Sequence, residues 1–145
     1  MIREFEETTR ISDEIKVILL NIEALETILM PNAIRYDIDK VQVSPVDNLP
    51  EVVMEIAELR DKVRVKQEEL MVAVMAARRL ISQITSAKVR EVMSCRYLLC
   101  LTQEQSAVRV GVSLRHAQRL EDKGIEECER YAGIKNPKTS VVVYN

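Results

Sequence analysis

Apolar residues recur along the first part of the chain at steps of four and three, which is the spacing of one face of a long helix. Between about Arg3 and Met30 no proline or glycine interrupts this repeat. Pro31 then ends it, because a proline ring clashes with the preceding helical turn. The pattern predicts a helix over about 3–30 with a seam of Ile11, Ile15, Ile18, Ile22, Leu25 and Leu29.

A second and longer run of the same repeat begins near Asn48. Asn48 and Glu51 have the spacing of an N-cap and the residue that reaches back to it, and Pro50 falls in the first turn, where a missing N–H does no harm. This helix would contain about 37 residues and extend roughly 55 Å at about 1.5 Å per residue. Its seam consists of Ile56, Leu59, Val63, Lys66, Leu70, Ala73, Ala77, Leu80 and Ile84, of which only Lys66 is polar.

So long a helix does not stand alone, because its apolar face must be covered. The first helix folding back as an antiparallel, coiled-coil-like hairpin, another copy of the chain, or both would cover it. An apolar cluster surrounds the helix near its end and favours a subunit interface, and the alternative is that it packs only on the rest of the same chain. The cluster is formed by Met71, Val72, Val74, Met75 and Ala76. Residues 32–47 lack a helical period, so we expect a loop there, with a short strand over 40–43 as an alternative.

The stretch from Thr102 to Lys123 has the pattern of two short helices joined by a tight turn. Thr102 and Gln105 have the spacing of a capping box at the start of the first helix, and Ser113 is placed to cap the second. Gly111 stands at the end of the first helix, where a left-handed backbone is usual. This combination predicts a helix-turn-helix.

Apolar positions around this motif predict how it packs. Ala107 supplies the small residue that two crossing helices need, and residues 86–101 form a supporting helix capped by Ser86. The second helix of the motif is expected to continue until Gly133 ends it. We expect inward contacts from Val108, Val110 and Val112 at the turn, from Leu114, Ala117 and Leu120, and from Val89, Val92, Met93, Arg96, Tyr97 and Cys100 on the supporting helix.

The outward face of the second helix is polar and basic. Arginine suits guanine and glutamine suits adenine, so Arg115, Gln118 and Arg119 are expected to read base edges in a major groove, with Ser113 and His116 beside them. The alternative is a solvated helix face that happens to be basic. The residues expected to attract phosphates are Lys88, Arg90, Arg109, Arg115, Arg119 and Lys123.

Charge is unevenly distributed along the chain, and the distribution supports a division between an N-terminal helical part and a C-terminal DNA-binding part. Residues 1–87 hold 11 Lys/Arg and 16 Asp/Glu, a net of −5, whereas residues 88–145 hold 10 and 7, a net of +3. Only the second half is therefore expected to meet nucleic acid. Abundant Leu, Ile, Val, Glu and Arg with three glycines and no tryptophan point to an all-α protein. We expect a helical oligomerisation hairpin over 1–85, a helix-turn-helix module over 86–133 and a tail over 134–145.

Several other classes of protein are disfavoured. The only histidine is His116 on the presumed reading face, and neither a nucleophile with a nearby base nor a glycine-rich phosphate loop is present, so an enzyme or a cofactor is not expected. Cys95, Cys100 and Cys128 lack a CxxC spacing, which favours free thiols over a metal site or disulfide. No apolar run is long enough for a bilayer and the N-terminus is too acidic for a signal peptide, so we expect a cytoplasmic protein that contacts no membrane.

The motifs of the second half resemble those of a known group of proteins. An Arg96-Tyr97 pair, a helix start at Leu101-Thr102, the small Ala107 and a Gly111-Val112-Ser113 turn look like the RinA/ArpU-type phage and prophage regulators, and are similar to region 4 of the primary bacterial sigma factors. The chain departs from that pattern in LRHAQRL and in Gln-Glu-Gln after Thr102.

The resemblance implies sequence-specific binding of double-stranded DNA that controls phage genes, by a homo-oligomer without a cofactor and with host RNA polymerase as a further partner. Small terminase subunits of tailed phages are the alternative, because they also join a helix-turn-helix to a helical oligomerisation region. They assemble as rings on viral packaging sites, so a ring of about eight or more copies would favour them.

Overall fold

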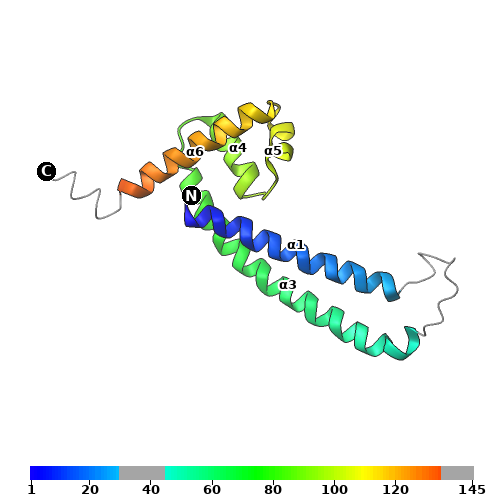
Figure 1. Cartoon of the computed structure of the whole chain (residues 1–145). Helices are drawn as coiled ribbons and strands as arrows, with labels where there is room; N and C mark the ends of the chain where they lie inside the picture. Colours follow the sequence, from blue (N-terminus) through cyan, green and yellow to red (C-terminus); the bar gives the residue numbers. More distant parts are fainter. Residues whose placement is uncertain (30–44, 135–145) are drawn as a thin grey trace. The chain divides into compact units, whose positions relative to one another are not determined.

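The computed structural model describes residues 1–29 and 45–134, and every regular element in them is an α-helix (Figure 1). The prediction of an all-α protein is therefore confirmed for this part of the chain. Most of the loop expected over 32–47, with its alternative strand over 40–43, lies outside the described residues, as does the tail beyond Ile134. Residues 45–47 of that expected loop are helical. The helices are α1 (Arg3–Leu29), α3 (Pro45–Ile81), α4 (Ala87–Tyr97), α5 (Gln103–Val110) and α6 (Leu114–Ile134).

The two long helices lie where the hydrophobic repeat predicts them, except that α3 begins earlier than expected. Helix α1 is helical from Arg3 to Leu29, the last described residue before the gap, so its predicted end near Met30 lies outside the described residues. Helix α3 has 37 residues but begins at Pro45, so Asn48 lies inside it and the prediction that Asn48 caps it is wrong. A proline suits the first helical position because its φ is already helical and its missing N–H is not needed there. Pro50 consequently lies inside the helix rather than in its first turn.

Contacts divide the chain into two compact units, and the division falls within both long helices. One unit is Ile11–Glu69, and the other combines Met1–Arg10 with the chain from Leu70 onward. Contacts thus group the start of α1 and the end of α3 with the C-terminal helices, whereas the sequence pattern assigned both to the hairpin. A boundary of this kind depends on contacts between residues that are distant in sequence.

In the Ile11–Glu69 unit, seam residues of α1 and α3 are buried and ion pairs join the two helices. Lys66, the polar residue of the predicted seam, places its Nζ 2.7 Å from Oε1 of Glu14. Arg60 pairs with Glu26. Both pairs are partly exposed, so each adds little to the free energy of folding. Their main effect is to fix the register of α1 against α3. The buried seam residues are Ile11, Ile15, Ile22, Ile56 and Val63.

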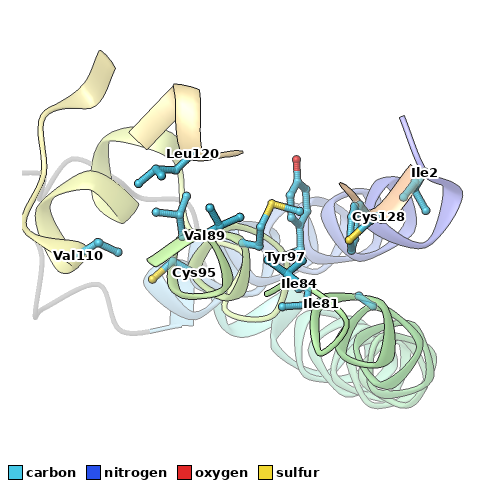
Figure 2. Close-up of a cluster of buried hydrophobic side chains, with 13 residues drawn as sticks. Ile2, Ile81, Ile84, Val89, Cys95, Tyr97, Val110, Leu120 and Cys128 are labelled. Carbon is cyan, nitrogen blue, oxygen red and sulfur yellow. The ribbon is translucent and has the colours of Figure 1, made fainter. Parts of the chain in front are cut away.

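The other unit has one hydrophobic core, to which five helices contribute (Figure 2). Tyr97 of α4 lies at its centre and is fully buried. Phe5, the only phenylalanine in the chain, stacks on Tyr97 with ring centroids 4.6 Å apart and planes 17° apart. Stacked aromatic pairs add about 0.5–1.5 kcal/mol to the effect of burial. The first turns of α1 are therefore part of the core that supports the C-terminal helices.

Helices α4 and α6 approach closely at Gly124. A Cβ added there would lie 2.5 Å from Cγ and 2.6 Å from Sδ of Met93, and 3.0 Å from Cγ1 of Val89. Met93 is fully buried among the other side chains of the core. A glycine in a helix interior costs about 1 kcal/mol relative to alanine, so its presence here reflects packing.

We expect Gly124→Ala to lower the free energy of unfolding by about 1–2 kcal/mol, because overpacking outweighs the gain in helix propensity. Chemical denaturation monitored by circular dichroism measures this change. Glu126→Ala, at an exposed position of the same helix, is the control and should change stability by less than about 0.5 kcal/mol. A Gly124→Ala variant that is more stable than the wild type would contradict the close packing.

Candidate nucleic-acid interface

Helix α5 begins and ends as its sequence predicts. The Thr102 hydroxyl accepts the Gln105 N–H at 3.1 Å, and Oε1 of Gln105 accepts the Thr102 N–H at 3.0 Å, which confirms the capping box. Gly111 is left-handed with φ 84°, and its N–H donates to the carbonyl of Ala107 at 2.9 Å. The Val112 N–H donates to the same carbonyl at 3.0 Å. Three residues therefore turn the chain from α5 into α6.

Helix α6 starts after Ser113, whose Oγ accepts the His116 N–H at 3.1 Å. Its inner side packs through Ala117 and Leu120, as predicted, but Leu114 remains 39% exposed. At the turn, Val110 is buried, whereas Val108 is 81% exposed. The predictions that Leu114 and Val108 pack inward are therefore wrong. Val108 lies on the solvent side of α5, whose other side packs in the core. Leu114 has the spacing of the buried face of α6, but it is the first residue of that helix and remains partly exposed there.

The predicted reading face of α6 is open to solvent. Arg115 and Arg119 lie one helical turn apart, and no acidic side chain within residues 1–29 and 45–134 forms an ion pair with either. Gln118, between them in sequence, donates from Nε2 to Oε1 of Gln103 at 3.1 Å. The predicted residues of this face are all exposed, namely Ser113, Arg115, His116, Gln118 and Arg119. Lys123, predicted to attract phosphates, and Asp122 beside it are exposed as well.

The three basic residues expected to reach phosphates from outside α6 differ in their surroundings. Arg109 on α5 is exposed. Lys88 lies 3.7 Å from Glu91 in an exposed pair that is weak enough to exchange for a phosphate. Arg90 instead donates from Nη1 to the carbonyls of Ile84 at 2.6 Å and Thr85 at 3.2 Å, so its side chain holds the connection between α3 and α4.

A buried carboxylate on α6 links the supporting helix to the motif. Glu121 is 5% exposed and accepts hydrogen bonds from Nε of Arg96 at 3.1 Å, the hydroxyl of Tyr97 at 2.5 Å and Nε2 of Gln103 at 3.1 Å. The guanidinium of Arg96 lies 5.2 Å from the centre of the Tyr97 ring. Burial, and then Glu121, raise the pKa of the Tyr97 hydroxyl well above its usual range, so Tyr97 stays a hydrogen-bond donor.

This buried network extends to the predicted reading face of α6 through two glutamines. Gln103 donates to Glu121 and accepts from Gln118, so a continuous series of hydrogen bonds runs from the core carboxylate to an exposed side chain of α6. Sequence analysis did not identify Glu121 or Gln103. The available signal was the spacing of Glu121 from Ala117 and Leu120, which places it near the inner side of the helix, where a lone carboxylate needs a partner.

The three cysteines are free, and each is at least partly buried. Cys95 and Cys128 are buried and Cys100 is half-buried. Burial is the main factor that raises the pKa of both buried thiols, that of Cys128 to about 11. The described residues contain no group of three His, Cys, Asp or Glu side chains able to hold a metal ion. Among residues 1–29 and 45–134, none of the helices has the length and apolarity that crossing a membrane requires.

Comparison of the chain with protein-family models, with curated proteins and with solved structures finds no match.

Proposed function

We propose that this protein binds duplex DNA in a sequence-specific manner, with α5 and α6 acting as a helix-turn-helix and the first half of α6 entering the major groove. One observation carries this proposal: Arg115, Gln118 and Arg119 are exposed together on the side of α6 that faces away from the core. Arginine pairs with guanine and glutamine with adenine at major-groove edges. The residues on the inner side of the same helix are held by packing, so the outward side chains are presented from a rigid element.

Attraction to phosphates supports the same proposal. Arg109 on α5 and Lys123 on α6 are exposed, so each is free to approach the DNA backbone. Each phosphate contact adds affinity that depends on salt but carries no sequence information. In this proposal the base contacts of α6 supply the sequence preference and the other cations supply the general affinity.

The long helices α1 and α3 would form an antiparallel hairpin that gathers copies of the DNA-binding module. Several linked modules bind DNA much more tightly than one module does. Once the first module is bound, the second is held close to the same DNA, so its binding becomes an intramolecular step. The resemblance to phage regulators favours control of transcription, whereas a small terminase subunit would use the same parts on a packaging site. A dimer that shifts a promoter fragment supports the former, and a ring of about eight or more copies supports the latter.

Arg119→Ala should weaken specific DNA binding by about 1–3 kcal/mol, because it removes one base-edge contact. A preferred duplex is first selected from a random pool by the wild-type chain, and mobility-shift titrations then compare the variants on that duplex. The matched control is Arg130→Ala on the same helix, where the arginine is exposed and lies 3.9 Å from Glu126. Equal weakening by both substitutions would mean that Arg119 contributes only general charge, and unchanged binding by Arg119→Ala would remove α6 from the proposed interface.

A further inference from the structure

Helix α3 carries apolar side chains on the side that faces away from its buried seam. Val72 is 71% exposed, Met71 is 63% exposed and Met75 is 44% exposed, whereas Ala73 and Ala77 are buried. Exposed apolar side chains that cluster on one face mark an interaction surface more often than scattered ones do. Because successive helical residues are turned by about 100°, Glu68, Val72, Met75 and Arg79 fall within an arc of about 60°.

The two ends of this face carry opposite charges. Glu68 and Glu69 precede the apolar side chains, and Arg78 and Arg79 follow them. Glu68 lies 3.9 Å from Arg64, in a pair whose members are both more than 60% exposed and which is therefore weak. Glu69 lies 3.7 Å from Lys66. Arg78 and Arg79 are exposed, and no acidic side chain in the described part of the chain forms an ion pair with them.

We propose that a second copy of this chain covers this face, with the two α3 helices packed antiparallel about a twofold axis that passes between Ala73 and Val74. In this register Val72 of one copy faces Met75 of the other, and Glu68 faces Arg79. A twofold axis repeats each of these contacts, so the surface is complementary to itself.

The charges decide between this arrangement and its alternatives. Parallel helices in the same register would bring Glu68 beside Glu68 and Arg79 beside Arg79, and like charges placed together disfavour a complex strongly. A different protein would need the same order of charges and apolar residues, which a second copy already has. The pairing would supply the gathering of copies that the proposed function assigns to the long helices, but it involves neither DNA nor the exposed face of α6. A chain that stays monomeric would therefore overturn the pairing and leave the proposed DNA contact standing.

Sedimentation equilibrium of the full chain without DNA, at about 0.1 M salt, tests this pairing. The wild-type chain is expected to reach twice its 16.6-kDa mass as concentration rises. Glu68→Arg and Arg79→Glu should each weaken self-association about tenfold or more, because each places two like charges together on both sides of the twofold axis. An equimolar mixture of the two variants should associate again, since every facing pair in the mixed dimer is then opposite in charge.

Both substituted residues are exposed, so the fold should persist, and circular dichroism checks that it does. Glu58→Arg makes the same charge reversal on α3 outside this face and should leave self-association unchanged. The double variant Glu68→Arg with Arg79→Glu should associate like the wild type. A wild-type chain that remains a monomer, single variants that associate normally, or a mixture that does not recover would each overturn the proposed pairing.

Discussion

Glu121→Ala is expected to lower the free energy of unfolding by about 3–5 kcal/mol, which is the usual effect of removing one member of a buried ion pair. The substitution leaves Arg96 without its carboxylate in a site where only 19% of its side chain is exposed. It also leaves the buried hydroxyl of Tyr97 without an acceptor, and an unpaired buried polar group costs about 1–3 kcal/mol by itself. Denaturant unfolding followed by circular dichroism measures the change.

The same variant tests whether the buried network positions the reading face. Gln103 loses its acceptor in Glu121→Ala, so the side chain that accepts the hydrogen bond from Gln118 is no longer fixed by the core. Glu126→Ala is the control, because Glu126 is exposed on the same helix and its ion pair with Arg130 is long. A Glu121→Ala variant as stable as Glu126→Ala would show that the carboxylate is not buried as described.

Phe5→Ala is expected to destabilise the unit that contains α4, α5 and α6, also by about 3–5 kcal/mol. Phe5 is fully buried, and its ring stacks on Tyr97, so the substitution removes a large side chain from the centre of the core and leaves a cavity. The expected loss includes both the transfer of the ring to water and the cavity that cannot collapse. Near-ultraviolet circular dichroism of Tyr97 should change along with the unfolding midpoint.

The control for Phe5→Ala is Val17→Ala on the same helix, where Val17 is 57% exposed. This substitution should change the free energy of unfolding by less than about 0.5 kcal/mol. If the two variants have equal stability, the first turns of α1 do not belong to the core of the C-terminal helices. In that case, the boundary near residue 85 suggested by the sequence would describe the chain better than the contacts do.

The features that sequence analysis predicted correctly depend on local signals. The uninterrupted repeat over α1, the capping box of Thr102 and Gln105 and the left-handed Gly111 each follow from a few neighbouring residues. Helix α3 shows the limit of such signals, because Pro45 and Asn48 both suit a helix start and nothing nearby decides between them. The earlier signal prevails, and the helix keeps its expected length with both ends moved three residues toward the N-terminus.

The features that sequence analysis missed depend on which distant residues meet. Phe5 lies more than 90 positions before Tyr97, and no periodicity reveals that the two rings stack. The spacing of Glu121 places it near the inner side of α6, but only the fold reveals that Arg96 and Tyr97 are the groups that pair with it. Arg90 was predicted from the sequence to attract phosphates. Its guanidinium instead donates a hydrogen bond to a backbone carbonyl just before the start of α4. The candidate face of α6 was predictable because exposure on one side of an amphipathic helix is a periodic property.

The central claim is that the first half of α6 reads DNA, and the most direct test is a nuclear magnetic resonance titration of the full chain with the selected duplex. Backbone amide shifts are expected to change most over residues 113–123, and the amides near Arg130, toward the other end of the same helix, are expected to change little. Changes confined to other helices, with the amides of Arg115 and Arg119 unmoved at saturating DNA, would contradict this claim.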